Sequence, residues 1–313
     1  MSCRLPRDRR SIGVCLQGML VLALAGCGGA QPVASNGPSA LESRTPSASN
    51  ASASSESLNA LREQLAGGLG GVTELNLAAK GFGPALGPLL ADSASLSHVT
   101  ALDVSDNDLG IDGARALARS SHLEAVRDLD LGGNDIGDEG ADAVAHAEAF
   151  AGLVTLNVSG NSIASRGASA LVAGSSTRLS SLDLSMNSIG KAGASSLASG
   201  HLHLKSLYLL GCEIGTSGIK ELAQSKQLGE LEVLALSGNN LGDDGAQALA
   251  KSTTLRNLVT LDLCANGIGD AGALALAQSS QFKKLKVLEL FGNDIGKRGS
   301  TALRKRFGAG LHL

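Results

Sequence analysis

Histidine and cysteine are the side chains of this sequence best suited to metal binding or nucleophilic chemistry, and their spacing favours neither. The chain has six histidines and five cysteines among its 313 residues. His201 and His203 form a close pair, but no third ligand follows nearby, whereas protein zinc sites use at least three protein ligands. No histidine converges with an acid and a nucleophile in the manner of a catalytic triad. The sequence therefore predicts no metal, no cofactor and no enzymatic activity.

Cys27 stands in a context that predicts a different chemistry, acylation of its thiol. Four arginines lie within residues 1–13, an apolar run follows from Val14 to Ala25, and the sequence Leu-Ala-Gly-Cys ends at Cys27. This order resembles a bacterial lipoprotein signal peptide, in whose family the peptide is cut before the cysteine and the cysteine carries lipid. The resemblance implies that residues 1–27 are a signal peptide and that Cys27 is lipidated. An ordinary secretory signal and a small retained anchor helix remain as alternatives.

The location of the protein follows from the same resemblance. Residues 28–57 consist mainly of Ser, Ala, Pro, Gly and Asn, a composition that cannot bury enough apolar surface to fold, so they are expected to be a disordered tether. Gly28 follows the cysteine, where Asp retains many Gram-negative lipoproteins at the inner membrane. The resemblance thus implies a lipid-anchored protein of the bacterial cell envelope, at the outer membrane, with its periplasmic or surface side left open.

Beyond the tether, the chain is an internal repeat with a period near 27 residues. Each repeat has an anchor leucine with Val or Leu three residues before it and Leu or Val two residues after it. The anchors are Leu75, Leu102, Leu129, Leu156, Leu182, Leu207, Leu234, Leu261 and Leu288. The alternation around each anchor predicts a strand with one buried face, and the aliphatic spacing further on predicts a helix.

A buried asparagine is expected in the turn between strand and helix, where its side chain can bond unpaired backbone groups. Asn stands five residues after the anchor in seven repeats: Asn107, Asn134, Asn161, Asn187, Asn239, Asn266 and Asn293. Lys80 and Cys212 are the two exceptions. This pattern resembles the leucine-rich repeat family, and within it the ribonuclease-inhibitor-like subtype, over residues 72 to about 306.

The resemblance implies an α/β solenoid, a curved horseshoe of about nine strand-turn-helix repeats over residues 72–313. A parallel sheet is expected on the concave face and helices on the convex face. The spacing of the elements predicts the same curvature. Neighbouring strands lie about 4.8 Å apart whereas packed helices lie 8–10 Å apart, so the stack must curve with its strands on the inside. Polar residues at the helix starts are predicted N-caps: Asp138, Ser165, Thr216, Asp243 and Asp270.

The ends of the stack need covers, because a terminal repeat exposes its core. Leu58, Leu61 and Leu65 lie at helical spacing and predict a capping helix over residues 58–71. The basic residues of the last helix are interpreted as a solvated cap rather than as an anionic-ligand site: Lys297, Arg298, Arg304, Lys305 and Arg306.

The residue after each anchor is expected to point to the concave face, and five of these nine residues are acidic. The acidic candidates, with Asp106 from the following turn, are Asp103, Asp106, Asp130, Asp183, Asp262 and Glu289. An apolar group accompanies them in the C-terminal half: Met186, Tyr208, Leu210, Cys264 and Phe291. Apolar residues ringed by carboxylates suit a basic protein or peptide partner.

Two cysteines fall inside the repeats, Cys212 and Cys264. They stand two repeats apart, roughly 10 Å at the parallel-strand spacing. That separation is too large for a disulfide, so both are expected to be unpaired thiols.

Composition narrows the function further. Only 2% of residues are aromatic and the formal net charge is −3, so neither a base-stacking platform nor a strongly basic nucleic-acid surface is expected. The sequence predicts a monomeric, membrane-anchored leucine-rich-repeat lipoprotein that binds protein through its concave face. The alternatives are a regulator or inhibitor of an envelope enzyme, and a structural spacer without a specific ligand.

Overall fold

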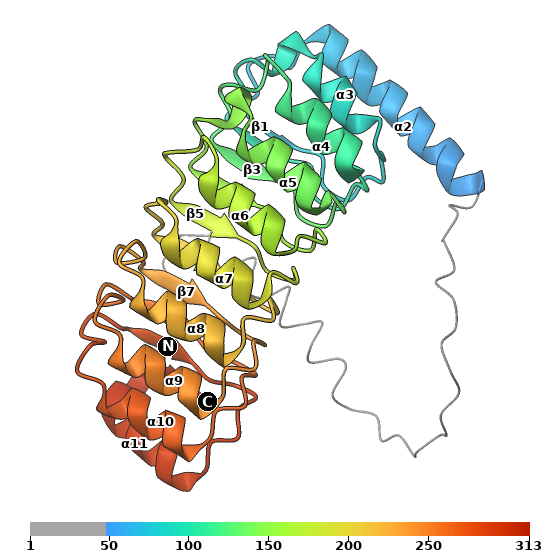
Figure 1. Cartoon of the computed structure of the whole chain (residues 1–313). Coiled ribbons are helices and arrows are strands. Elements are labelled where there is room, and N and C mark those ends of the chain that lie inside the picture. The colour runs from blue at the N-terminus through green and yellow to red at the C-terminus, as the bar shows by residue number, and fades with distance from the viewer. Residues whose placement is uncertain (1–47) are drawn as a thin grey trace, which may run out of the picture. The chain divides into compact units, whose positions relative to one another are not determined.

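Residues 48–313 are described by the structure, a computed structural model (Figure 1). The predicted signal peptide, Cys27 and the tether up to residue 47 lie outside the described residues. None of the described helices is long and apolar enough to cross a membrane.

One parallel sheet runs through the described residues, with its strands in chain order. The strands are β1 (Glu74–Asn76), β2 (Ala101–Asp103), β3 (Asp128–Asp130), β4 (Thr155–Asn157), β5 (Ser181–Asp183), β6 (Ser206–Tyr208), β7 (Val233–Ala235), β8 (Thr260–Asp262), β9 (Val287–Glu289) and β10 (Leu311–His312). Each anchor leucine pairs with the anchor of the next repeat, so the predicted register is confirmed. The short strand β10 extends the sheet beyond the nine predicted repeats, pairing with β9.

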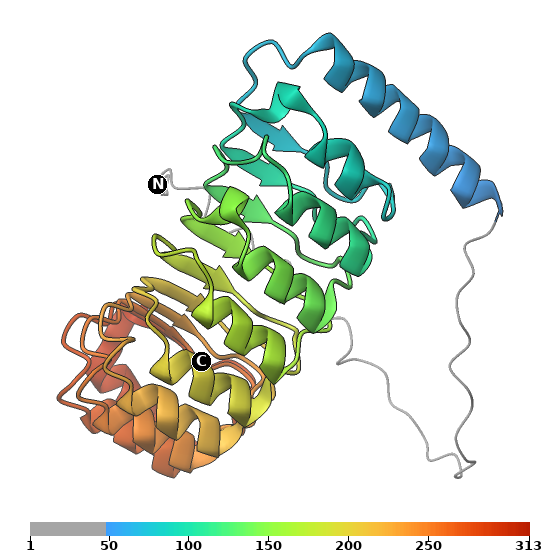
Figure 2. The same ribbon diagram turned by 45° about the horizontal axis from the view of Figure 1, so that its top comes forward.

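Helices cover the other face of the sheet, and Figures 1 and 2 show them stacked side by side along the repeats. They are α2 (Ala48–Gly67), α3 (Leu86–Ala91), α4 (Gly110–Ala118), α5 (Gly137–Ala145), α6 (Ser165–Ala173), α7 (Gly190–Ser199), α8 (Gly215–Gln224), α9 (Gly242–Lys251), α10 (Asp270–Gln278) and α11 (Lys297–Phe307), with short 3₁₀ helices at Ala94–Leu96, Glu148–Phe150 and Gly308–Gly310. The core between the layers is continuous and mostly Leu, Ile, Val and Ala. The predicted curved solenoid of strand-turn-helix repeats is confirmed.

The turn asparagines form a ladder of buried hydrogen bonds between neighbouring repeats. Asn161 donates from Nδ2 to the carbonyl oxygens of Leu131 (2.8 Å) and Ser159 (3.0 Å). Its Oδ1 accepts the backbone N–H groups of Asn134 (3.0 Å) and Ile136 (3.3 Å) in the preceding repeat. Each asparagine therefore satisfies backbone groups that the core would otherwise leave unpaired.

Cys212 interrupts this ladder. Its thiol donates to the carbonyl oxygens of Leu184 (3.2 Å) and Leu210 (3.6 Å), but it brings no amide oxygen to the preceding turn. The N–H of Ile189 donates instead to the carbonyl oxygen of Asn187, at 2.9 Å. In the repeat before Cys212, the turn is therefore held by a hydrogen bond within the turn rather than by a side chain of the next repeat.

The predicted helix caps are wrong in one respect, because the aspartates cap the next helix rather than their own. Asp243, in the first turn of α9, accepts at Oδ1 the N–H groups of Gly269 (2.8 Å) and Gly272 (2.7 Å) at the start of α10. Asp138 and Asp270 do the same for α6 and α11. The close approach explains the glycine, since a Cβ at Gly272 would lie 2.7 Å from Asp243 Oδ1.

Ser165 and Thr216 are not N-caps of their helices either. The residues at the cap positions of α6 and α8 make no side-chain cap bond, and Thr216 donates from Oγ1 to the carbonyl oxygen of Leu241, at 2.9 Å. Ser165 is the first residue of α6 and Thr216 the second residue of α8, so neither occupies the cap position.

The N-terminal cap is longer than predicted. Helix α2 begins at Ala48, ten residues before the expected start at residue 58, so the expected tether is wrong over residues 48–57. Leu61 and Leu65 are buried in the core, as a cap requires. The Ala- and Ser-rich residues before them extend the helix because nothing in that stretch, such as Pro or Gly, breaks it.

Candidate functional site

The concave face of the sheet is built from the strand residues that alternate with the buried leucines. In β3, Leu129 is buried, while Asp128 is exposed and Asp130 partly buried on the opposite side. The parallel register places the residues that follow the anchors in one row from Asn76 to Glu289. The sheet thus brings the predicted acidic candidates onto one face, since successive side chains of a strand alternate between faces.

The acidic residues of the N-terminal half are held by amides of neighbouring strands. Asn76 donates from Nδ2 to Asp103 Oδ2 (2.8 Å), and Asn157 donates to both oxygens of Asp130 (3.0 Å each). Burial, opposed by the hydrogen bonds and aided by the charges of neighbouring aspartates, raises the pKa of Asp130. Asp106 lies in the turn after β2 and is exposed.

Two predicted acidic contact residues are buried rather than open. Asp183 exposes 7% of its surface and Asp262 only 4%. Asp183 accepts the N–H of Ser185 (2.8 Å), and Asp262 accepts the hydroxyl of Ser237 (2.6 Å) and the N–H of Cys264 (2.9 Å). Their carboxylates therefore hold the backbone that follows β5 and β8, and they are not accessible to a partner.

Replacing Asp183 by Asn should raise the melting temperature at pH 7 by a few degrees. Burial raises the pKa of Asp183, so the folded chain holds this proton more tightly than the unfolded chain. The stability contributed by the protonated form is complete below the unfolded pKa and is lost as the pH rises through the folded pKa. Asn accepts the Ser185 N–H without that loss. Thermal unfolding at pH 4.5 and 7 measures the difference.

Asp128→Asn, at an exposed position of β3, is the matched control for that comparison. The gain of Asp183→Asn should shrink at the lower pH. An equal gain at both pH values would mean that ionisation of the buried carboxyl is not its cause.

The apolar candidates form two groups rather than one. Met186, 62% exposed, donates its N–H to the carbonyl oxygen of Leu210 (2.6 Å) and lies beside the strand that carries Tyr208. Phe291, 47% exposed, follows β9. Three strand spacings, about 14 Å, separate β6 from β9.

Between the two groups lie buried Ala235, Ser237 and Cys264. Cys264, a predicted contact residue, exposes only 6% of its surface and is not open to a partner. Glu289 is partly buried, and its Oε1 lies 2.6 Å from His312 Nδ1 of β10. The prediction of one apolar cluster ringed by carboxylates is therefore wrong: the open acids lie over the N-terminal strands and the apolar side chains over the C-terminal ones.

Cys212 and Cys264 are unpaired buried thiols. Burial is the main cause that raises the pKa of both, for Cys212 to about 12. A thiol that stays protonated is a poor nucleophile, so neither is suited to catalysis. His201 and His203 are both exposed, and His203 lies 3.6 Å from Glu230. No group of three metal-ligating side chains forms within residues 48–313.

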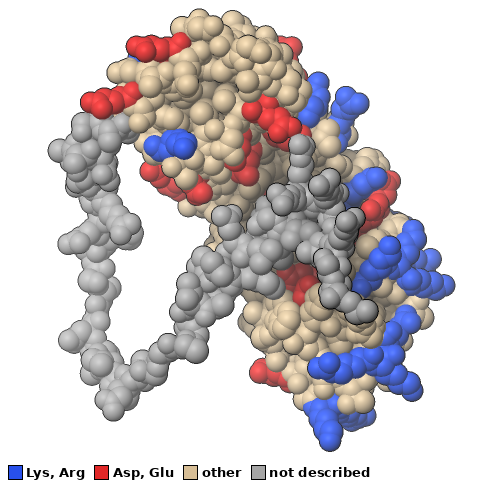
Figure 3. Space-filling view, turned by 180° about the vertical axis from the view of Figure 1, so that it is seen from behind, with Lys and Arg blue, Asp and Glu red and all other residues tan. Residues whose placement is uncertain are grey.

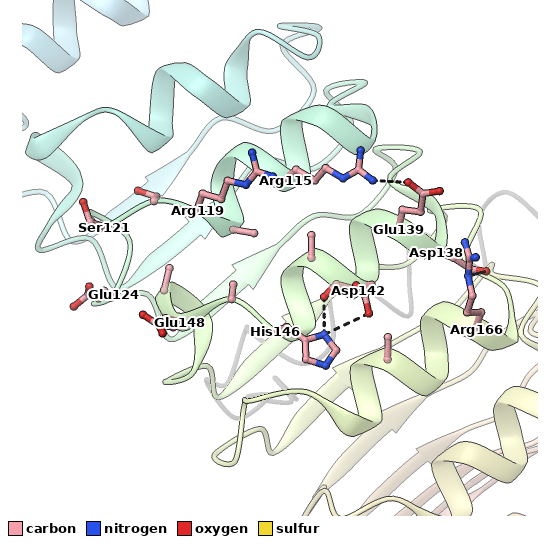
Figure 4. A pocket seen from close by; sticks show the side chains of 16 residues that line it. Arg115, Arg119, Ser121, Glu124, Asp138, Glu139, Asp142, His146, Glu148 and Arg166 are labelled. Atoms are coloured by element: carbon pink, nitrogen blue, oxygen red, sulfur yellow. Dashed lines mark hydrogen bonds and ion pairs between the residues drawn. The ribbon is translucent and has the colours of Figure 1, made fainter.

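A groove of about 870 Å³ lies between α4, α5 and α6, on the helical face that sequence reasoning did not consider. Figure 4 shows charged side chains along it, with Arg115 reaching Glu139 and Arg166 reaching Asp138. His146 Nδ1 lies 3.4 Å from Asp142 Oδ1. These charges pair with one another at an exposed surface, so the groove presents no concentrated charge to a ligand.

Solved structures with a similar chain path include the TLR13–ssRNA13 complex, with 20% identity and a TM-score of 0.40, covering 74% of this chain and 30% of that one. The Rad7–Elc1 complex of yeast has 16% identity and a TM-score of 0.46, covering 98% and 80%. The ectodomain of the Arabidopsis receptor kinase HAESA, in complex with an IDA peptide hormone, has 24% identity and a TM-score of 0.35, covering 59% and 33%. The chain thus spans about a third of the TLR13 and HAESA chains.

No curated protein matches the sequence significantly. The family model described as Leucine Rich repeat matches eight segments: residues 95–118, 122–145, 153–172, 175–198, 200–223, 231–250, 254–277 and 283–303. These segments cover more than half of the chain and follow the structural repeats one by one. By its sequence and its repeating strand-turn-helix architecture, this chain belongs to the leucine-rich repeat family.

Proposed function

We propose that this leucine-rich-repeat chain binds a protein or peptide through the concave face of its sheet. The observation that carries the proposal is the exposure of Met186 and Phe291, in the turns that directly follow β5 and β9. The exposed large hydrophobic residues of the described chain are Val72, Ile111, Val154, Met186 and Phe291. Met186 and Phe291 are the two with the largest exposed fractions, 62% and 47%. The extended inner surface of a solenoid is a common binding surface.

The charge distribution narrows the class of partner. Asp103, Asp106 and Asp130 supply carboxylates over β2 and β3, about 14 Å from the apolar residues of β6. A partner with basic groups at one end and apolar side chains at the other matches this arrangement. Attraction between the charges would speed its association, and the buried apolar contacts would slow its release.

The proposal includes membrane anchoring. The Leu-Ala-Gly-Cys sequence ending at Cys27 supports lipidation there, which would anchor the domain in the bacterial cell envelope, at the outer membrane. Several acyl chains on one residue give stable anchoring where one chain would be marginal. The repeat length of 25 to 27 residues with a helix in each repeat favours the ribonuclease-inhibitor-like subtype. A non-enzymatic role completes the proposal.

Site-specific photo-crosslinking in cells tests the concave face. A photoreactive residue at position 186 or 291 should give the same single adduct, because one partner is expected to span both apolar groups. The matched control is position 111 on helix α4, where Ile111 is also exposed but faces away from the sheet. An adduct of equal yield at position 111, or none at 186 and 291, would contradict the concave site and favour a spacer role.

Met186 and Phe291 are also expected to determine the affinity for the partner. Met186→Ala and Phe291→Ala should each weaken binding of the crosslinked partner roughly tenfold, since exposed apolar anchors contribute more than 1 kcal/mol at partner interfaces. Both side chains are exposed, so thermal stability should not change. Ile111→Ala should leave both affinity and stability as they are. Isothermal titration with the purified partner measures all three variants.

A further inference from the structure

A row of uncompensated positive charge follows one edge of the C-terminal repeats. This basic edge lies where helices end and strands begin, a place that the parallel topology puts on the same side in every repeat. It consists of Arg178, Lys205, Lys226, Lys251, Arg256, Lys283, Lys284, Lys286, Arg304, Lys305 and Arg306, all exposed. Figure 3 shows Lys and Arg gathered along one flank of the lower half of the molecule.

The charges of the basic edge have no acidic partners. No ion pair within residues 48–313 joins any of the eleven to a carboxylate, and the acids in the same connections are Glu230 and Glu232. Lys284 donates to Asn257 Oδ1 (2.7 Å), and Arg306 donates to the Ser279 carbonyl oxygen (3.4 Å), both neutral acceptors. Four basic residues elsewhere are paired: Arg115 with Glu139, Arg166 with Asp138, Lys191 with Glu221 and Lys220 with Asp244.

The helix dipole does not account for this row. Cations are favoured at helix C-termini in every repeat, so a dipole effect should appear along the whole edge. The corresponding connections of the N-terminal repeats instead carry Arg119 and Arg127 against Asp92, Glu124 and Glu148. The positive charge is therefore specific to the repeats from α6 onward.

We propose that the basic edge docks on anionic phospholipid headgroups. The edge is a row of turns rather than a groove, and it offers no open aromatic ring for stacking on bases: Phe282 is buried, and Arg306 lies over Phe307. Extended rows of lysine and arginine are attracted to anionic membranes, each cation strengthening binding by roughly fivefold near the surface. An anionic bilayer matches the charge and the breadth of the row.

The choice of a membrane rests on the proposed lipid anchor in one respect. With lipid on Cys27, residues 28–47 would keep the domain within at most about 70 Å of the bilayer. Tethering raises the local concentration of the edge at the headgroups, so individually weak contacts would suffice to hold it there. In this orientation the basic edge of the repeats would contact the headgroups, and the concave face would remain accessible to a protein partner.

Fluorescence quenching at two ends of one helix tests this orientation. In the chain from residue 28 onward, which lacks the predicted signal peptide and Cys27, a fluorophore is attached at Ser280→Cys on the basic edge or at Ala271→Cys on the opposite edge. Both positions are exposed: Ala271 lies in the first turn of α10 and Ser280 lies two residues after its end. Vesicles of phosphatidylcholine, with or without 30% phosphatidylglycerol, carry a headgroup quencher. Only the label at position 280 should be quenched, and only by the anionic vesicles.

Removing charge from the edge should reverse the docking. Lys283→Gln, Lys284→Gln and Lys286→Gln together should weaken it about 100-fold, at roughly fivefold per cation. The matched control removes three cations from the opposite edge, with Lys191→Gln, Lys297→Gln and Arg298→Gln, and should leave quenching unchanged.

Three outcomes would overturn the proposal: equal quenching of both labels, equal quenching by neutral vesicles, or no effect of the triple substitution. Tighter binding of a single-stranded oligonucleotide than of the anionic vesicles would also overturn it, in favour of a nucleic acid. The chain used carries no acyl group and keeps its concave face intact. Failure here is therefore distinct from failure of the lipid anchor or of the protein-binding site.

Discussion

Asn161→Ala should destabilise the repeat domain by about 4 kcal/mol, a large fraction of the stability of a typical domain. The substitution leaves the N–H groups of Asn134 and Ile136 without their side-chain acceptor. It also removes one of two side-chain donors to the carbonyl oxygen of Leu131, which keeps only the bond from Asn134 Nδ2 (3.0 Å). Asn161 is fully buried, so water does not replace these bonds without opening the turn. Each unsatisfied buried group costs about 1–3 kcal/mol. Urea unfolding followed by circular dichroism measures the loss.

Cys212→Asn is the complementary variant, because it inserts the missing member of the same ladder. Its Oδ1 can accept the N–H of Ile189, which now bonds within its own turn, and a net gain of about 1 kcal/mol is expected. The surface variant Asn59→Ala in α2 controls for loss of an asparagine as such. If Asn161→Ala cost no more than this control, the ladder would not stabilise the stack.

Cys27→Ser should abolish membrane retention and leave the chain without acyl groups. In lipoproteins this thiol carries the lipid, and Ser lacks the nucleophilic sulfur that would form the thioether. In a bacterial expression host, the expected result is a shift of nearly all protein from the membrane fraction to the soluble fraction. Mass spectrometry of the N-terminal peptide and fractionation of cells measure both effects.

Cys15→Ser is the matched control, since it changes a cysteine of the same apolar segment without touching the predicted cleavage site. It should preserve acylation and membrane retention. Retention of the Cys27→Ser chain, with an unmodified N-terminus in the parent protein, would show that Cys27 is not the anchor.

The repeat chemistry made much of the fold predictable. Leu156 is buried and Asn157 faces the concave side because each strand must bury one face in every repeat, whatever the rest of the chain does. Asn161 occupies the turn because the backbone there needs a side-chain partner. Burial of one strand face and pairing of the turn backbone are required in every repeat, so the residues that provide them can be predicted from the sequence alone.

The candidate site was less predictable, because exposure depends on neighbours across the stack. Asp183 and Asp103 occupy equivalent positions, yet Asp183 is buried whereas Asp103 is partly open. Their difference comes from the side chains and turns packed around each strand, which the repeat pattern does not encode. The same holds for Met186 and Phe291, which follow β5 and β9 and lie four strand spacings apart instead of in the expected single cluster.

The sequence by itself determined that the chain is a leucine-rich-repeat solenoid, which leucines fill its core and which strand positions point to the concave side of the sheet. These properties follow from a period that each repeat enforces through its own burial and backbone pairing. Only the tertiary structure decided that Asp243 caps the helix of the next repeat, that two of the acidic residues are closed to a partner, and that lysines from separate connections meet on one edge. Each of these depends on contacts between repeats, where residues about 25–30 positions apart come within hydrogen-bonding or electrostatic range.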